Sequence, residues 1–587
     1  MMIKIFKNME KKDLLIVLVV IALVVFSVFL DLRMPEYMSE ITKLVQTENS
    51  TMNEILKAGL YMIICAVFSL VCTIIVGYLT SLLSARFSRT IRKRIFEKVE
   101  SFGIAEIKKF STSSLITRTT NDVSQIEMLL AMGLQLLIKA PVMAIWALLK
   151  ILGKSGELTT VTAIGVVIVV VVNLIIISIV SPRFQKIQKL TDKLNGVTRE
   201  SLTGIRVIHA FNAEKFSENR FNDVNEDLTG IHLRVTKTFA WMDPVMNFVM
   251  HFQILGIYIV GAYLIMNSTL IDKINIFSNV VVFSSYGMQV IISFLMLTMI
   301  FMFLPRALVS IKRINEVLDS DISVISGNYK GSTSEKGTVE FRNVSFKYPD
   351  ADEYLLKNIS FKANQGETVA FIGSTGSGKS TLINLVPRMY DATDGEIFVD
   401  GVNVKEYDTH ELNNRIGYIS QKAVMFTGTV EENVSYGDNG KKKPTLDEVK
   451  KAIKIAQGED FIEKMDKKYS SHIARGGTNI SGGQKQRLSI ARAIARDPEI
   501  YIFDDSFSAL DYQTDLKLRQ ELKKNMKDAT SLIVAQRIGT IMNADKIIVL
   551  DKGECVGIGT HKELLKSCKV YKEIALSQLS EEELENA

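Results

Sequence analysis

Six long apolar stretches alternate with polar connections over roughly the first half of the chain. A helix that crosses a bilayer takes about 20 apolar residues, and each stretch is close to or above this length. After Pro305 no comparable run occurs. The pattern therefore predicts six membrane-spanning helices, over residues 14–30, 58–83, 129–152, 158–180, 245–266 and 280–303.

The first stretch shares a feature with secretory signals, because Lys11 and Lys12 precede its apolar core. No small-residue cleavage pattern follows it, and the polar sequence that starts at Asp31 leads away from it. Both features argue against a cleaved signal. We expect a helix that is retained in the protein.

Two long polar connections, residues 86–127 and 183–240, are rich in lysine and arginine, whereas the short connections contain far fewer. Basic residues near the ends of membrane helices mark the cytosolic side. We therefore expect both connections, the N-terminus and the second half of the chain to be cytosolic. Apolar residues such as Ile91 and Ile95 keep helical spacing in these connections, which predicts that the membrane helices continue into the cytosol.

The second half of the chain has a different pattern. Short β-like runs such as residues 339–341 and 368–372 alternate with helical segments, which is typical of an α/β domain. We predict a multi-domain protein in which a six-helix transmembrane domain precedes an α/β P-loop ATPase domain. The predicted boundaries are a transmembrane domain over 1–318, a linker over 319–336, a nucleotide-binding domain over 337–576 and an acidic tail over 577–587.

Composition agrees with a membrane protein that has a large polar part. The chain is 47% hydrophobic with 70 Lys+Arg against 64 Asp+Glu, so its formal net charge is only +6. Nucleic-acid binding usually needs a concentrated basic face, so we expect no nucleic-acid partner. The four cysteines show no C-x-x-C spacing, which favours reduced thiols. No Arg/Ser-rich amphipathic leader is present, so we expect a bacterial cytoplasmic membrane rather than a mitochondrial one.

The strongest local signal follows the predicted strand 368–372 and matches G-x-x-x-x-G-K-[ST]. Glycines let backbone N–H groups curl around a polyphosphate, the lysine supplies a positive charge, and the serine hydroxyl can bind Mg²⁺. A helix that begins here adds the positive end of its dipole. The predicted phosphate-binding residues are Gly373, Ser374, Thr375, Gly376, Ser377, Gly378, Lys379, Ser380 and Thr381.

Two further motifs follow at a distance along the chain. An apolar strand over residues 500–503 ends at Asp504, where a carboxylate can hold Mg²⁺ beside the phosphate loop. One helix earlier stands the tetrapeptide of Ser481, Gly482, Gly483 and Gln484. With these three motifs in this order the sequence resembles an ATP-binding cassette (ABC) ATPase, whose signature is Ser-Gly-Gly-Gln.

The resemblance covers almost the whole chain, because six membrane helices followed by one cassette is the half-transporter arrangement of ABC exporters. It implies that ATP and Mg²⁺ bind, with Tyr348 stacking on adenine and Gln421 reaching the metal together with Ser380 and Asp504. It also implies that Asp511 lies in a loop that crosses to a second cassette. In this family two cassettes close head to tail, so the segment 481–484 would serve ATP bound by the partner.

The sequence departs from the family at two catalytic positions. Asp505 stands where the family places the glutamate that polarises the attacking water, and Gln536 stands where it places a histidine. Asp is shorter by one methylene, and a misplacement near 1 Å can lower a rate about 10²-fold. The chain therefore resembles the degenerate-site subunit of heterodimeric multidrug-type exporters, which binds ATP and hydrolyses it slowly.

The membrane half gives weaker signals. Residues 113–121 and 210–216 fall where exporters place the two short helices that couple the membrane helices to the cassettes. Ionisable groups inside membrane spans are costly and often functional, so Lys139 and His251 are candidate cargo-contacting residues.

Taken together, these features predict one half of a heterodimeric exporter that uses ATP to move small hydrophobic or amphipathic compounds out of the cell. Its expected partners are a second half-transporter subunit, membrane lipid and that substrate. Two alternatives stay open, namely a homodimeric lipid or peptide exporter and a nucleotide-gated channel or regulatory subunit.

Overall fold

The computed structural model describes residues 9, 11–47, 50–331, 333–580 and 584. Its contacts divide the chain into two compact units. The helical unit comprises Met1–Glu100 and Ser113–Ser320, and the ATPase unit comprises Ser101–Thr112 and Asp321–Ala587. Part of the predicted acidic tail, residues 581–583 and 585–587, lies outside the described residues.

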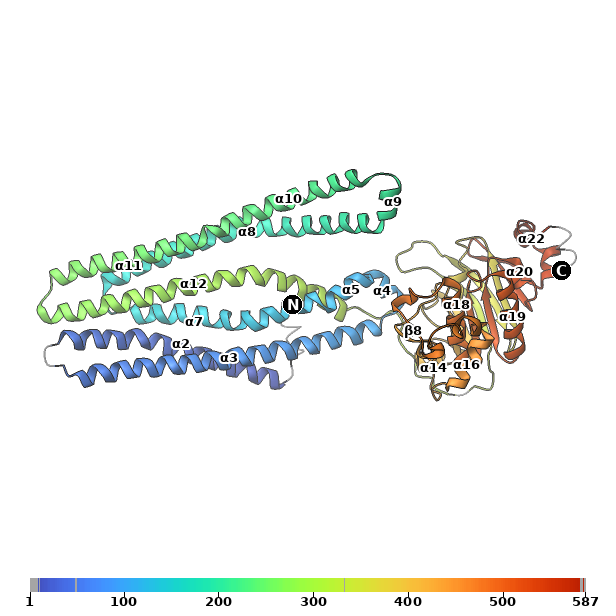
Figure 1. The fold of residues 1–587 in the computed structure, drawn as a ribbon, viewed down its shortest axis with the longest axis horizontal. Helices are drawn as coiled ribbons and strands as arrows, with labels where there is room; N and C mark the ends of the chain where they lie inside the picture. The colour runs from blue at the N-terminus through green and yellow to red at the C-terminus, as the bar shows by residue number, and fades with distance from the viewer. Residues whose placement is uncertain (1–8, 10, 48–49, 332, 581–583, 585–587) are drawn as a thin grey trace. The chain divides into compact units, whose positions relative to one another are not determined.

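The helical unit consists of long helices joined by short turns (Figure 1). Its principal helices are α2 (Lys11–Gln46), α3 (Met52–Glu100), α7 (Leu134–Ile151), α8 (Gly156–Thr203), α10 (Glu214–Ala240), α11 (Met242–Met266) and α12 (Leu270–Leu318). Shorter segments lead from α3 toward α7, namely α5 (Thr112–Thr119), α6 (Asn121–Met128) and the π-helical turn η1 (Leu129–Gly133).

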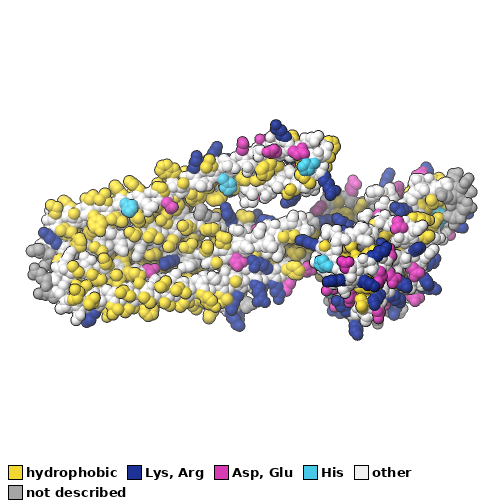
Figure 2. All heavy atoms as spheres, in the orientation of Figure 1, with side chains coloured by type: hydrophobic (Ala, Val, Ile, Leu, Met, Phe, Trp, Pro, Cys, Tyr) yellow, Lys and Arg dark blue, Asp and Glu magenta, His cyan; other side chains and the backbone are white. Residues whose placement is uncertain are grey.

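Within the described residues, six helical stretches are long and apolar enough to cross a membrane, which confirms the predicted number. They are Lys11–Gln46, Met52–Glu100, Thr112–Ile151, Gly156–Thr203, Glu214–Met266 and Asp272–Leu318. Large hydrophobic side chains cover much of the visible face of this unit in Figure 2. On α3 such exposed side chains include Leu60, Ile63, Val67, Phe68 and Ile74, as expected for a surface that faces lipid.

The helices extend well beyond the apolar stretches of the sequence. Helix α3 has 49 residues, about twice the length that a bilayer needs. The first apolar stretch ends at Leu30, but α2 continues to Gln46 across Asp31 and Glu36. These carboxylates can stay inside the helix bundle because Lys139 and Lys150 of α7 pair with them.

Helix α12 is central to the helical unit and packs against α2, α7, α8 and α11. Its fully buried Phe283 and Tyr286 lie in one apolar cluster with Ala147 and Ile151 of α7. The Tyr286 hydroxyl donates a hydrogen bond to the Leu32 carbonyl at 2.8 Å. Figure 1 shows α10 and α11 running alongside α8, with which they are in contact.

The ATPase unit is built on two large sheets, besides a two-stranded sheet of β7 (Gly428–Thr429) and β8 (His472–Ile473). The six-stranded sheet has the order β12-β11-β3-β10-β9-β6, and only the edge strand β12 is antiparallel. Its strands are β3 (Thr368–Gly373), β6 (Ile416–Ile419), β9 (Ile500–Asp504), β10 (Thr530–Val534), β11 (Lys546–Asp551) and β12 (Glu554–Gly559). The four-stranded antiparallel sheet has the order β2-β1-β4-β5, with β1 (Val339–Phe346), β2 (Leu356–Ala363), β4 (Asp394–Val399) and β5 (Val402–Asn403).

Continuous apolar runs explain the parallel strands, because such strands are covered on both faces. The residues of β9 are all buried, as are the four central residues of β3. Parallel pairing brings the carboxyl ends of β3, β9 and β10 to one edge of the sheet. This arrangement confirms the predicted fold class and defines where the candidate site lies.

A short part of the first basic connection belongs to the ATPase unit. Helix α4 (Ile104–Phe110) lies in this part, and its Glu106 carboxylate accepts a hydrogen bond from the Ser323 backbone N–H at 3.0 Å. Ile104 and Ala105 pack against the apolar cluster of the antiparallel sheet. The first predicted coupling segment, residues 113–121, is therefore misplaced, because those residues group with the helical unit. Their polar helical pattern does not distinguish them from the neighbouring turn that carries the contacts.

The second predicted coupling segment, residues 210–216, spans the turn between α9 (Ile205–Ala210) and α10. Phe211 and Phe216 there are 77% and 71% exposed. Large exposed apolar side chains at a turn between two helices are unusual for a monomer and are typical of a protein–protein contact. The turn therefore stays a candidate docking point.

A glycine contact tests the packing of α11 against α12. A Cβ atom at Gly261 would lie 2.3 Å from Val280 Cγ2, so Gly261→Ala should separate the two helices locally. Overpacking of this kind costs about 1 to 3 kcal/mol. Thermal unfolding of the purified full-length protein in detergent should show a lower melting temperature. Gly59→Ala is the control, since no atom lies within 4 Å of the position that its added methyl group would take, and equal melting of both variants would contradict the packing.

Candidate functional site

The phosphate-binding motif forms a tight loop between β3 and α13 (Lys379–Asn384). Gly376 and Gly378 adopt φ angles of 85° and 94°, which favour glycine, and a Cβ at Gly378 would lie 2.6 Å from Leu356 Cδ2. Ser374, Thr375 and Gly376 are exposed at the loop's tip. A curled backbone that leads into a helix N-terminus suits a polyphosphate.

The Lys379 side chain folds back under this loop. Its ammonium group donates to the carbonyls of Gly373 at 2.9 Å and Ser374 at 2.8 Å. Burial lowers the pKa of Lys379, and attraction to Asp505 and Asp504 opposes that shift. The amine is thus held by neutral carbonyls within reach of both carboxylates, where it can turn toward an anion.

Asp504 ends β9 beside the loop. The Ser380 hydroxyl donates to Asp504 Oδ1 at 2.6 Å, and the Tyr418 hydroxyl donates to Oδ2 at 3.4 Å. Burial raises the pKa of Asp504, against the lowering effect of the Ser380 hydrogen bond. A buried carboxylate beside a hydroxyl is an oxygen donor set of the kind that Mg²⁺ prefers, so these residues fit the predicted metal site.

Asp505 brings together the residues predicted to be catalytic. Its Oδ2 accepts hydrogen bonds from Gln536 Nε2 at 2.8 Å and Gln421 Nε2 at 3.2 Å. Its backbone has a φ of 46°, a left-handed conformation that is uncommon outside glycine. Burial raises the pKa of Asp505, whereas the amide hydrogen bond from Gln421 lowers it. One carboxylate oxygen therefore accepts hydrogen bonds from both amides.

Tyr348 lies in an aromatic group next to the loop. Its ring meets Phe346 and Tyr390 edge-on, and its hydroxyl forms a 2.9 Å hydrogen bond with Thr381 Oγ1. The Lys108 ammonium of α4 lies 4.9 Å from the centre of the Tyr348 ring, within the range of a cation–π contact. The tyrosine is thus joined to both the phosphate loop and α4.

The signature segment caps α18 (Gly482–Ala495). The Ser481 hydroxyl accepts from the Gln484 backbone N–H at 3.3 Å, and the Gln484 side chain accepts from the Ser481 N–H at 2.8 Å. This reciprocal capping leaves Ser481 and Gly482 exposed at the helix N-terminus, with Gly483 beside them. Asp511 likewise caps α19 (Tyr512–Asn525).

Two contacts of this site were not expected from the sequence. Tyr418 stands three residues before Gln421 on β6, so its position on a strand that leads to the site was a usable signal. Lys108 gave no such signal, because it lies far away in the chain and reaches Tyr348 only through folding.

The candidate cargo residues differ from each other. Lys139 pairs with Asp31 at 3.1 Å inside the helical unit. His251 is exposed on α11.

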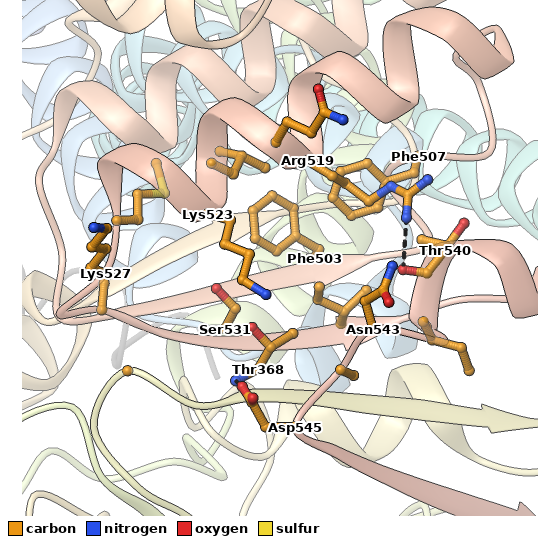
Figure 3. A pocket seen from close by; sticks show the side chains of 18 of the residues that line it. Thr368, Phe503, Phe507, Arg519, Lys523, Lys527, Ser531, Thr540, Asn543 and Asp545 are labelled. Carbon is orange, nitrogen blue, oxygen red and sulfur yellow. Dashed lines mark hydrogen bonds between the residues drawn. The ribbon is translucent and has the colours of Figure 1, made fainter. Parts of the chain in front are cut away.

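Figure 3 shows a separate cavity of about 500 Å³ in the ATPase unit. Phe503 and Phe507 lie within it, and Arg519 donates to the Thr540 carbonyl at its edge at 3.2 Å. Thr368 and Ser531, at the starts of their strands, also line it. No residue of the phosphate loop contributes to its lining, so this cavity is not the candidate nucleotide site.

Comparison with protein families gives two matches. Residues 17–294 match the ABC transporter transmembrane region, and residues 356–508 match the family described as ABC transporter. Uncharacterized ABC transporter ATP-binding proteins of Mycobacterium tuberculosis and Bacillus subtilis are 36% and 35% identical, each over 89% of this chain and over 89% and 90% of their own lengths. An ATP-dependent lipid A-core flippase of Haemophilus influenzae is 32% identical over 87% of this chain and 86% of its own.

One solved structure has the same fold throughout. It is a bacterial Atm1-family ABC exporter with ATP bound, which matches with a TM-score of 0.78 over 97% of this chain and 98% of that chain. The two sequences are 22% identical, so the match concerns the fold.

The N-cap of α19 predicts how the stability of the protein changes with pH. Hydrogen bonding from Thr514 lowers the pKa of Asp511, so its stabilising charge is complete above the ordinary value of 3.8 and is lost as the pH falls through the lowered value. Asparagine also caps helices well, so Asp511→Asn removes the charge and keeps a cap. Because the charge stabilises the protein at neutral pH, the melting temperature of the purified wild-type protein should exceed that of Asp511→Asn there. The difference should shrink in acid.

Asp515 in the same helix serves as the control. Burial raises its pKa, against the effect of Arg519, so stability from this group falls as the pH rises from 3.8 through the raised value. The wild-type advantage over Asp515→Asn should therefore grow in acid. Slopes of the same sign for both variants would contradict these assignments.

Proposed function

Because this chain belongs to the ABC transporter family, we propose that it is one half of a heterodimeric exporter that drives hydrophobic or amphipathic compounds outward across the cytoplasmic membrane. Its membrane region and ATPase domain lie on one polypeptide, as in an exporter half-transporter. Transport of the exporter type, coupled to ATP, follows from the family. The heterodimer, its unequal ATP sites and the cargo class are the proposed part.

The nucleotide would lie across the loop of residues 373–381. Backbone N–H groups and Lys379 would hold the phosphates, and Tyr348 would stack on adenine. Mg²⁺, when bound, would supply positive charge to the phosphates, held by Ser380, Gln421 and Asp504. The hydrogen bond between Ser380 and Asp504 already brings two of these oxygens within 2.6 Å.

The observation that carries the proposal is the engagement of Asp505. A glutamate would reach one methylene farther, on the order of 1.5 Å, toward an attacking water. The shorter Asp505 instead accepts two amide hydrogen bonds on one oxygen, from Gln421 and Gln536. Neither amide can accept a positive charge, as a histidine could. These contacts support a site that retains ATP and hydrolyses it slowly.

The segment 481–484 supports a role for a second subunit. Ser481 and Gly482 lie exposed at the start of α18, where a helix N-terminus attracts an anion. In a head-to-tail dimer this segment would face ATP held by the partner. Hydrolysis would then take place where this chain contributes the segment 481–484, and the partner contributes the phosphate loop and the water-activating residues.

A homodimeric lipid exporter is the second candidate. It is favoured by the relative from Haemophilus influenzae, an ATP-dependent lipid A-core flippase that aligns over most of this chain. In a homodimer both ATP sites would carry Asp505 and Gln536, and turnover would be slow in both. A nucleotide-gated channel or regulatory subunit would bind ATP without uphill transport in vesicles. In each case the N-terminus and the ATPase domain would be cytosolic.

The two dimers respond differently to substitutions in this chain. In the purified heterodimer, the double substitution Asp505→Glu with Gln536→His should change ATPase activity little, because turnover depends on the partner's site. Gly482→Asp should abolish most of it, because it places a carboxylate where the partner's γ-phosphate would lie. A Cβ at Gly482 has no atom within 4 Å and a helix N-terminus tolerates a negative charge, so folding should be unaffected.

The same variants in the chain purified alone provide the contrast. A homodimer should gain up to about 10²-fold in ATPase activity from the double substitution, since each site would be repaired. Rapid ATP turnover by the unmodified chain without a second subunit would refute the degenerate site. ATP binding to each variant, measured without turnover, serves as the folding control.

A further inference from the structure

A pair of opposite charges lies inside the membrane helices. The Lys139 ammonium of α7 is 3.1 Å from Asp31 Oδ2 of α2, and both side chains are less than one-fifth exposed. Ser69 of α3 donates to Asp31 Oδ1 at 2.5 Å. Lys139 and Ser69 fall within two of the long apolar stretches of the sequence, where charged groups are costly and usually functional.

The pair borders a cavity of about 350 Å³. Residues of α2, α3, α7 and α12 line it, among them Asp31, Met34, Met38, Met62, Met143 and Gln289. Lys139 is not among them and reaches the cavity only through Asp31. The walls therefore combine one carboxylate with four flexible, apolar thioether side chains.

Gln289 supplies an unused acceptor. Its Nε2 donates to the Asp31 carbonyl at 3.4 Å, but its buried Oε1 has no hydrogen-bond partner among the described residues. A buried polar atom without a partner costs free energy that a ligand with a matching donor recovers. Since Asp31 and Gln289 both offer oxygens, the cavity calls for a ligand that donates hydrogen bonds.

The charge balance restricts the ligand further. Asp31 and Lys139 already neutralise each other, so a head group with a single uncompensated cation would add net charge in a medium of low dielectric constant. A head group that carries both an ammonium and an anion adds none. Its N–H donors would form the stronger, charge-assisted hydrogen bonds with the carboxylate.

We propose that this cavity binds the head group of a zwitterionic amphipath whose ammonium carries N–H donors, with the methionines contacting the start of its apolar chain. The inference rests on the proposed transport function and names the substrate class of that function. The ammonium donates to Asp31 and to Gln289 Oε1, and Lys139 balances the charge of Asp31 before the ligand arrives.

Two lysophospholipids that share one lauroyl chain test the proposal. Lysophosphatidylethanolamine has N–H donors, and lysophosphatidylcholine has the same net charge without them. The purified transporter, in maltoside micelles without ATP, should bind the ethanolamine compound about tenfold or more tightly, measured by its ligand-dependent rise in melting temperature. Equal binding of both compounds would overturn the proposal.

Matched variants identify the residues responsible. Asp31→Asn should abolish the preference, so that the ethanolamine compound binds about as weakly as the choline compound. Glu36→Gln should leave it unchanged, because Glu36 lies on the same helix and pairs with Lys150 at 2.7 Å but does not line the cavity. If Asp31→Asn fails to fold, Gln289→Met keeps the ion pair and should still lower the preference. An undiminished preference in a folded variant at either position would refute the assignment.

Two further arms separate the sources and the claims. Free glycerophosphoethanolamine, which keeps the zwitterionic phosphodiester head group but has no chain, should bind at least about tenfold more weakly than the lysolipid, because the methionine contacts are lost. Equal affinity would refute an amphipathic ligand. Because binding is measured without ATP hydrolysis, a failure here leaves the ATPase asymmetry intact, and a failure of the Gly482→Asp experiment leaves this binding result intact.

Discussion

Parallel pairing of β3, β9 and β10 is the constraint on which the candidate nucleotide site depends. It brings the phosphate loop, Asp504 and the end of β10 to one edge of the sheet, although they lie far apart in the chain. Asp505, one residue beyond this edge, can then accept amides from two other loops on a single oxygen. The short acidic side chain is held by these contacts, which is why the proposed division of labour between two subunits centres on it.

In the helical unit, two ion pairs join the same two helices. Asp31 pairs with Lys139 and Glu36 with Lys150, in both cases between α2 and α7. Removing one member of a buried pair leaves an uncompensated charge and is far more costly than the pair itself. These pairs therefore hold the two helices in register, and the first of them also borders a cavity with an unused acceptor.

Helix α4 shows how one element can serve two purposes. It belongs to the polypeptide segment between two membrane-spanning helices, yet its contacts are with the ATPase unit. Glu106 secures it to the segment that begins that unit, and Lys108 lies over the ring of Tyr348. A nucleotide that stacked on Tyr348 would therefore lie next to Lys108, a residue of the connection between two membrane-spanning helices.

The sequence by itself determined the number of membrane-spanning helices, the α/β cassette and the replacement of the usual glutamate and histidine by Asp505 and Gln536. Those features are recorded locally, as runs of apolar residues or as short motifs. Only the tertiary structure decided that α4 rather than residues 113–121 carries the docking contacts, that Lys108 joins the site, and that Asp31 pairs with Lys139. A hydrophobic pattern states which positions are buried, but the partner of a buried polar group is chosen by residues distant in the chain, and that choice exists only after folding.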